Sequence, residues 1–293
     1  MSGIDTVGVV GAGLMGSGIA EVCARAGLQV HLYDLTAAAI DSGLARIDKS
    51  LARAEKSGKL TATDRASARD RIDAETDIAA LAPVGLVVEA VVEDEAVKLD
   101  IFRQLDSVVT DREAILASNT SSIPIMKIAM ATSRPDHVIG VHFFNPVPVL
   151  KLVEIVPSLL TSEHTEDRAR AFATEVLGKT TIRSQDRAGF IVNSLLVPYI
   201  LAAIRMLDSG FASAEDIDNG MVLGCAHPMG PLRLADLIGL DTVKAIAEAM
   251  YDEFKEPLYS PVPFLLRMVE AGLLGKKVGR GFYDYESAVA GAR

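Results

Sequence analysis

Residues 6–16 read Thr-Val-Gly-Val-Val-Gly-Ala-Gly-Leu-Met-Gly. The apolar run predicts a buried strand, and the G-x-G-x-x-G pattern of Gly11, Gly13 and Gly16 follows it and opens a predicted helix over residues 14–26. The first glycine permits a tight turn, the second lets a pyrophosphate approach the backbone, and the third lets the helix lie close to the strand. This arrangement predicts a dinucleotide-binding turn.

Two features around the turn concern the identity of the dinucleotide. Leu14 and Met15 begin the expected helix, whose free backbone N–H groups and dipole attract a pyrophosphate. Asp34 ends the next expected strand, where a carboxylate accepts hydrogen bonds from the adenosine ribose hydroxyls and repels a 2′-phosphate. Since no arginine directly follows Asp34, we expect NAD rather than NADP. A tight turn followed by an ordinary capping aspartate is the alternative interpretation.

The 293 residues exceed the usual size of one domain, so two domains are predicted. In the first half, short apolar runs alternate with stretches of helical periodicity, which is typical of a parallel sheet covered by helices. After Asp186 the apolar residues recur at helical spacing without a convincing strand. We therefore expect a Rossmann-type α/β domain at residues 1–186 and an all-α domain at residues 187–293.

The same periodicities predict the individual elements. Strands are expected at residues 6–10, 29–34, 86–92, 114–118, 137–144, 150–156 and 180–184. The amphipathic stretch 36–56 is too long for an ordinary crossover, so it is expected to form a helical hairpin that projects from the sheet. Other helices are expected at residues 163–177 and, in the second domain, at residues 190–209, 213–223, 232–254 and 262–274.

Composition excludes several classes of protein. The net charge is −10 and no Lys/Arg run is longer than two, so neither nucleic acid nor an anionic membrane is an expected partner. Cys23 and Cys225 lack a disulfide or metal-ligand spacing, so no metal is expected. The chain has no apolar stretch long enough to span a bilayer, and residues 1–5 contain no basic segment ahead of an apolar one. A cytoplasmic location is expected.

A histidine and a glutamate form the candidate catalytic pair. His142 lies at the carboxyl end of an expected strand, the edge where open α/β sheets bind ligands, and imidazole titrates near neutral pH. Glu154 is embedded in an apolar run, where an unpaired charge is costly. If the two strands are neighbours, Glu154 can orient His142 for proton transfer. A histidine satisfied inside the core and a glutamate solvated on an edge strand are the alternatives.

Residues 118–122 read Ser-Asn-Thr-Ser-Ser and close another expected strand. Their hydroxyls and amide are therefore expected at the same sheet edge as His142, where they could orient a hydroxyl or a carbonyl of a substrate. Capping of a helix or a turn is the alternative role for such residues.

With these motifs, the sequence closely resembles the 3-hydroxyacyl-CoA dehydrogenase family. The serine-rich block and the His-Phe-Phe-Asn-Pro block that begins at His142 are more specific than the glycine motif. The resemblance covers almost the whole chain, in blocks at residues 11–18, 87–93, 117–122, 140–154, 189–193, 227–231 and 275–285.

The resemblance implies roles for further residues. His142 would be the general base and Glu154 its orienting acid, while Ser121 and Asn193 would bind the substrate oxygens. It implies a second group near the nicotinamide of the cofactor, consisting of Glu93, Lys98, Asn145 and Lys277. In the helical hairpin it implies that Ser50 and Lys56 contact the CoA moiety, with Lys59 as a competitor for the second position. A helical second domain that forms a homodimer is also implied.

The implied activity is the NAD-dependent oxidation of an (S)-3-hydroxyacyl-CoA, such as 3-hydroxybutyryl-CoA, to the 3-oxoacyl-CoA, a step of fatty-acid metabolism. Two departures from the family pattern, Ala188 in place of proline and Ser194 in place of arginine, concern the local hinge and the acyl preference. The rival interpretations are a dehydrogenase of a free hydroxy acid or sugar acid, similar to gulonate dehydrogenases, and a protein that binds NAD(H) without turnover.

Overall fold

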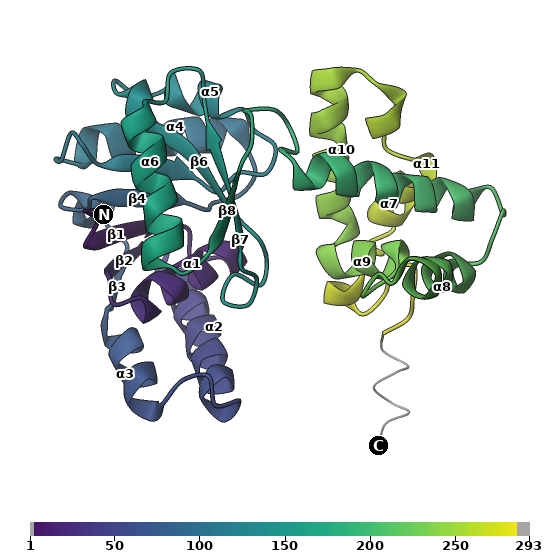
Figure 1. Ribbon diagram of the computed structural model, residues 1–293, viewed down its shortest axis with the longest axis horizontal. Helices are drawn as coiled ribbons and strands as arrows, with labels where there is room; N and C mark the ends of the chain where they lie inside the picture. The colour runs from purple at the N-terminus through teal and green to yellow at the C-terminus, as the bar shows by residue number, and fades with distance from the viewer. Residues whose placement is uncertain (1–2, 286–293) are drawn as a thin grey trace. The chain divides into compact units, whose positions relative to one another are not determined.

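The computed structural model describes residues 3–285, so residues 1–2 and 286–293 of the two predicted domains lie outside it. The chain divides into two compact units, residues 1–186 and residues 187–293 (Figure 1). Each unit buries its own hydrophobic cluster. The fold class predicted from the sequence, a Rossmann-type domain followed by a helical domain, is confirmed.

Within the described residues, unit 1 forms one eight-stranded sheet in the order β3-β2-β1-β4-β5-β6-β7-β8. All neighbouring strands pair in parallel except β6 and β7, which are antiparallel. The chain moves outward from β1 in both directions, so the switch point of the sheet lies at the glycine turn. The strands are β1 (Thr6–Val10), β2 (Gln29–Tyr33), β3 (Ile72–Glu75), β4 (Leu86–Glu89), β5 (Ile115–Ser118), β6 (Val138–Phe143), β7 (Leu152–Pro157) and β8 (Thr180–Arg183).

Every strand predicted from the sequence is present, and β3 was not predicted. Strands β4, β5 and β6 are buried along their whole length, which is why they appear as continuous apolar runs. Strand β3 reads Ile-Asp-Ala-Glu and lies at the edge of the sheet, with Asp73 and Ala74 exposed. Because a short, half-exposed edge strand has little apolar periodicity, the sequence pattern does not reveal it.

Helices cover both faces of this sheet. Ile19 of α1 and Ala169 of α6 share a core with Val141 on one face, whereas Gly140 faces Ile125 of α5 on the other. The helices of unit 1 are α1 (Leu14–Arg25), α2 (Ala37–Lys56), α3 (Ala62–Asp70), α4 (Glu95–Val108), α5 (Ile125–Ala129) and α6 (Glu163–Ala171), which continues as a π-helical turn at Phe172–Val176. Short 3-10 turns lie at Ile78–Leu81 and Pro135–His137.

The hairpin predicted within residues 36–56 requires a correction. This stretch forms one continuous helix, α2, which the Thr36 hydroxyl caps by accepting a hydrogen bond from the Ala39 N–H. The second arm is α3, which begins with a capping box between Thr61 and Asp64 and which we did not predict. Helix α3 is short and polar, so it has little apolar periodicity. Figure 1 shows α2 and α3 extending together from the sheet.

Within residues 187–285, unit 2 has helices as its only named elements, with two isolated β-bridges among Gly275, Arg280 and Asp284. The expected helix at residues 232–254 is two helices, because Gly239 adopts φ 104° and ends the first of them. The helices are α7 (Val192–Asp208), α8 (Ala214–Cys225), α9 (Pro231–Ile238), α10 (Leu240–Phe254) and α11 (Pro263–Glu270), with 3-10 turns at Pro257–Tyr259 and Lys276–Val278. In the described part of the chain, no helix has the length and apolar character needed to cross a membrane.

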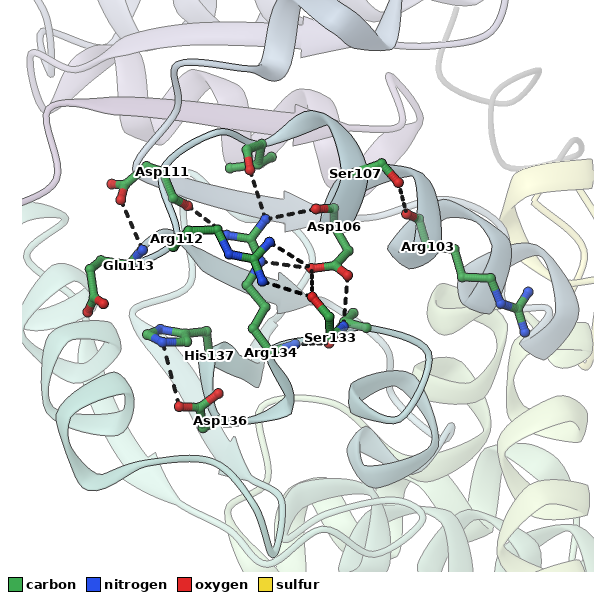
Figure 2. A network of polar contacts seen from close by, with 12 residues as sticks. Arg103, Asp106, Ser107, Asp111, Arg112, Glu113, Ser133, Arg134, Asp136 and His137 are labelled. Atoms are coloured by element: carbon green, nitrogen blue, oxygen red, sulfur yellow. Dashed lines mark hydrogen bonds and ion pairs between the residues drawn. The ribbon is translucent and has the colours of Figure 1, made fainter.

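A buried arginine fixes the loops at the amino ends of β5 and β6 (Figure 2). Arg134 is 3% exposed, and its guanidinium donates hydrogen bonds to the Asp106 carboxylate and to the backbone carbonyls of Asp106, Val109 and Asp111. These carbonyls lie at and just beyond the end of α4, where helical partners are lacking. Burial alone would raise the pKa of Asp106, but hydrogen bonds from Ser133 and Arg134 and the charge of Arg134 hold it below its ordinary value.

We expect Arg134→Met to lower the free energy of unfolding by about 3 kcal/mol, because it removes the side-chain donor to three backbone carbonyls and the cation that pairs with the Asp106 carboxylate, whose remaining hydrogen bonds come from Ser133. Denaturant unfolding measures this loss. The matched control is Arg112→Met, since Arg112 lies 3.7 Å from the same carboxylate but its side chain is 59% exposed. The control should lose less than about 1 kcal/mol.

The pH dependence follows from the lowered pKa of Asp106. A carboxyl whose folded pKa lies below its unfolded value stabilises the fold above the unfolded pKa, about 3.9, and this stabilisation disappears as the pH falls through the folded pKa. The difference between wild type and Arg134→Met should therefore be largest at neutral pH and shrink below about pH 4. Equal losses in the two arginine variants, or a difference independent of pH, would contradict this assignment.

Candidate active site

The glycine turn has the close backbone contacts that its three glycines predict. Gly11 adopts φ 101°, and a Cβ there would lie 2.6 Å from the Ala90 carbonyl oxygen. A Cβ on Gly16 would lie 1.7 Å from the carbonyl oxygen of Gly11, so α1 begins directly against the turn. Gly13 is the N-cap residue of α1, and a Cβ there would meet open space. The turn therefore leaves room for a ligand at the helix N-terminus.

Asp34 lies beside this turn, at the end of β2. Its Oδ2 accepts a hydrogen bond from the Ala12 N–H and its Oδ1 accepts one from the Leu35 N–H, both at 2.8 Å. Each carboxylate oxygen has a further lone pair, so the half-buried side chain can still accept hydrogen bonds from a ribose diol. Leu14 and Met15 begin α1 at the same place. These groups fit the adenosine and pyrophosphate parts of a dinucleotide.

His142 and Glu154 are in direct contact. They are paired residues of the antiparallel strands β6 and β7, and Nδ1 of His142 lies 2.7 Å from Oε2 of Glu154. His142 is 6% exposed and Glu154 is fully buried. Because a carboxylate only accepts hydrogen bonds, Nδ1 carries the proton in this contact and Nε2 is the nitrogen suited to proton transfer. The neighbouring strands that the sequence analysis required for this pair are therefore present.

The Ser118–Ser122 loop begins at the last residue of β5, at the same edge, and is held by Glu93. Oε1 of Glu93 accepts hydrogen bonds from the Thr120 hydroxyl at 2.5 Å, the Ser121 N–H at 3.0 Å, and the N–H and hydroxyl of Ser122. Burial alone would raise the pKa of Glu93, but the charge of Lys98 and these hydrogen bonds keep it below its ordinary value. Glu93 is therefore an anion, and its partly exposed side chain fixes the backbone of Ser121.

Lys98 lies deeper than the resemblance alone indicates. It is 1% exposed, and its Nζ lies 2.6 Å from Oε1 of Glu89 and 3.3 Å from Oε2 of Glu93. Glu89 was not identified from the sequence, although it has the same signal as Glu154, a carboxylate within an apolar strand. Because Lys98 lies behind Glu93, it supports the edge of the site by pairing with the Glu93 carboxylate.

A narrow groove of about 110 Å³ lies between α1, α2 and the turn after β6. Ser50 and Asn145 both line it, together with Arg46 and the buried Glu21. Burial raises the pKa of Glu21, against the effect of a hydrogen bond with Ser50. Lys56 is exposed at the end of α2. The groove thus joins the glycine turn to the helical hairpin.

Two of the predicted site residues belong to unit 2. Asn193 is 8% exposed in the first turn of α7. Lys277 follows the last helix, and its Nζ lies 2.6 Å from both carboxylate oxygens of Asp241. Of the two departures from the family pattern, Ala188 donates its N–H to Glu253, and the Ser194 hydroxyl donates to the Phe190 carbonyl. Both departures therefore have local partners within unit 2.

Among residues 3–285, no cluster of three or more His, Cys, Asp or Glu side chains is arranged to hold a metal ion. The polar groups at this edge are backbone N–H groups, hydroxyls, an imidazole and carboxylates. Such a set suits a dinucleotide and an alcohol or carbonyl substrate.

Comparison with known proteins identifies the same family over both units. The model of the 3-hydroxyacyl-CoA dehydrogenase NAD binding domain matches residues 6–187, and that of the C-terminal domain matches residues 189–285. A 3-hydroxybutyryl-CoA dehydrogenase of Mycobacterium tuberculosis is 60% identical over 96% of this chain and 99% of its own. The human mitochondrial hydroxyacyl-coenzyme A dehydrogenase is 43% identical over 97% of this chain and 92% of its own.

A solved structure gives the same result. The crystal structure of (S)-3-hydroxybutyryl-CoA dehydrogenase from Ralstonia eutropha has a TM-score of 0.91 and 48% identity, covering 96% of this chain and 99% of that chain. The cofactor predicted from the sequence, NAD, agrees with the description of the matching N-terminal domain.

We expect Asp34→Ser to weaken NADH binding by roughly 10- to 100-fold, because it removes the charged group that we expect to accept hydrogen bonds from the ribose hydroxyls. The affinity for NADPH should improve relative to that for NADH, since the 2′-phosphate is no longer repelled. Fluorescence titration with both nucleotides measures the two dissociation constants. The control is Asp73→Ser, which removes an exposed carboxylate from the neighbouring strand β3 and should leave both constants unchanged. An unchanged NADH-to-NADPH ratio in Asp34→Ser would refute the role of Asp34.

Proposed function

The chain belongs to the 3-hydroxyacyl-CoA dehydrogenase family, and from this premise we propose that its substrate is a short (S)-3-hydroxyacyl-CoA such as 3-hydroxybutyryl-CoA. The enzyme is an NAD-dependent dehydrogenase, and its product is the corresponding 3-oxoacyl-CoA. The observation that carries this proposal is the buried contact of 2.7 Å between His142 and Glu154, at the sheet edge where the glycine turn also lies.

In the proposed reaction Nε2 of His142 would remove the proton of the C3 hydroxyl as C3 loses its hydride. NAD, when bound, supplies the hydride acceptor. Glu154 keeps the other imidazole nitrogen protonated and compensates the positive charge that develops on the ring. Ser121 and Asn193 hydrogen-bond the substrate oxygens and so align the hydroxyl with His142. In the reverse direction the same imidazolium returns the proton.

The cofactor is proposed to lie along the carboxyl edge of β1, β2 and β4. Its pyrophosphate would contact the turn, its ribose would contact Asp34, and its nicotinamide would lie near a second group of side chains. The turn consists of Gly11, Gly13, Leu14, Met15 and Gly16, and the second group consists of Glu93, Lys98, Asn145 and Lys277. Because Lys98 is buried behind Glu93, we propose that it acts on the nicotinamide region through Glu93.

The CoA moiety is proposed to contact α2. Ser50 and Lys56 share this helix with three further exposed basic residues, Arg46, Lys49 and Arg53. The four basic residues are spaced by three or four positions, so they form a stripe along one face of the helix. In a chain with net charge −10, this local positive stripe favours the phosphates of CoA. It supports a CoA ester over a free hydroxy acid or a sugar acid.

Unit 2 is proposed to complete the substrate cleft and to form a homodimer. Several of its large apolar side chains are exposed, among them Leu195, Phe211 and Leu223 at 73%, 78% and 82%. Such exposure is typical of a surface that another chain covers. A cytoplasmic location stays a prediction of the sequence.

The proposed substrate is tested by initial rates with a series of 3-hydroxyacyl-CoA chain lengths, followed through NADH absorbance. We expect turnover with NAD and 3-hydroxybutyryl-CoA and a much lower rate with NADP. Gulonate and free 3-hydroxybutyrate serve as controls for the rival substrates. Turnover of either free acid without turnover of the CoA ester would overturn the proposal, and NADH binding without any turnover would favour a protein that only binds the nucleotide.

The catalytic pair is tested by Glu154→Gln, which preserves the shape of the side chain and removes its charge. We expect kcat to fall by roughly 10²- to 10⁴-fold with a smaller change in KM, because the imidazole loses its orienting acid. His142→Gln should be at least as damaging. The double variant should be little worse than the more damaging single variant, since the two residues act as one unit. Thermal melts control for folding, and additive losses in kcat would contradict the pair.

A further inference from the structure

Glu89 is a buried carboxylate that the proposed reaction does not use directly. It ends β4, is fully buried, and lies between Val10 and Ser118 of the neighbouring strands. Its partner Lys98 is also buried, with Nζ 2.6 Å from Oε1. Burying two charges costs several kcal/mol per ion before they pair, and apolar replacements of such pairs often stabilise a protein. A contribution to the stability of the fold therefore does not by itself explain why this buried pair is present.

Three segments of the candidate site meet at this carboxylate. Oε1 accepts hydrogen bonds from Nζ of Lys98 in α4 and, at 2.7 Å, from the N–H of Val91 in the loop after β4. Oε2 accepts a hydrogen bond of 2.6 Å from the Ser118 hydroxyl, at the start of the serine-rich loop. Ser118 in turn accepts a hydrogen bond from the Thr120 N–H through the same hydroxyl oxygen. Glu89 thus holds one end of the loop that contains Ser121.

The other end of this loop is held by Glu93, which the same ammonium group contacts. Nζ of Lys98 lies 3.3 Å from Glu93, whose carboxylate binds the Ser121 and Ser122 backbone. Lys98 therefore lies between two carboxylates, one of which binds the first residue of the loop while the other binds its last three residues. If the charge of Glu89 were lost, Lys98 would be drawn toward Glu93 alone, and the hydrogen bonds between Glu93 and the loop would change.

We propose that Glu89 is a positioning residue, which acts through Ser118 and Lys98 to fix the loop that presents Ser121 to the substrate. This assignment rests on the proposed function, in which Ser121 binds a substrate oxygen. A displacement of about 1 Å at such a contact costs roughly 10²-fold in rate. The role of Glu89 therefore predicts an energetic coupling to Ser121, which a purely structural residue would lack.

The test is a double-mutant cycle on kcat between Glu89→Gln and Ser121→Ala, in the full-length enzyme. Glu89→Gln keeps the shape of the side chain, and we expect it to lower kcat by roughly 10²-fold with a smaller change in KM. In the Ser121→Ala background, where the positioned hydroxyl is absent, the same substitution should lower kcat by less than about tenfold. Additive losses in the cycle would overturn the assignment.

Two further variants keep the test decisive. Ser118→Ala removes one hydroxyl, so it preserves the buried ion pair, and it should show the same coupling to Ser121 with a smaller loss. If Glu89→Gln does not fold, Ser118→Ala replaces it in the double-mutant cycle with Ser121→Ala. Additive losses of kcat in that cycle would overturn the assignment equally. The matched control is Asp106→Asn, which weakens the Arg134 network at the opposite sheet edge. This control should lower the melting temperature while leaving kcat and KM unchanged.

Turnover by the wild-type enzyme distinguishes a failure of this assignment from a failure of the proposed function. Turnover of 3-hydroxybutyryl-CoA by the wild type, combined with additive losses in the cycle, would overturn the role of Glu89 alone. Absence of turnover in the wild type would overturn the proposed function and this assignment together. A loss of kcat in Asp106→Asn as large as that in Glu89→Gln would show that general destabilisation accounts for the effect.

Discussion

Parallel pairing of four adjacent strands is the constraint on which the candidate site of unit 1 depends. Because β1, β4, β5 and β6 run in the same direction, they all end at one edge of the sheet. The segments that leave this edge contain the glycine turn, Glu93, the serine-rich loop and Asn145. Strand β7 runs in the opposite direction, and its register with β6 sets Glu154 against His142. Groups that are distant in the sequence thereby become neighbours.

Burial determines what the charged groups at this edge can do. Glu89 and Glu154 are both fully buried, and each must have a partner because an isolated carboxylate is costly in an apolar sheet. Glu154 has an imidazole as its partner, and an imidazole can both accept and donate a proton, which makes the pair suitable for proton transfer. Glu89 has an ammonium group, a backbone N–H and a hydroxyl as partners, all of which donate hydrogen bonds to it, which makes it suitable for holding structure. The chemistry of the partner therefore separates a catalytic role from a positioning role.

The sequence predicted the elements whose signals are local. Continuous apolar runs revealed the central strands, and the spacing of Gly11, Gly13 and Gly16 revealed the turn between β1 and α1. It did not reveal β3 or α3, which are short and half exposed, or the break at Gly239 within an otherwise helical pattern. The pairing of His142 with Glu154 was predicted conditionally, since the neighbour of a strand is a property of the whole sheet. Glu89 was missed although it has the same local signal as Glu154, a carboxylate within an apolar strand.

The backbone of Ala12 couples the glycine turn to the helical hairpin. Its N–H donates to Asp34, and its carbonyl accepts hydrogen bonds from the Ser17 hydroxyl at 2.9 Å and from Arg46 at 3.0 Å. A Cβ on Gly43 would lie 2.7 Å from the same carbonyl oxygen, so only glycine lets α2 come this close to the turn. A shift of α2 would therefore disturb the residue whose N–H donates to Asp34. The helix proposed to contact CoA and the turn proposed to hold NAD consequently meet at the backbone of one residue, on the two peptide groups that flank its Cα, so each constrains the geometry of the other.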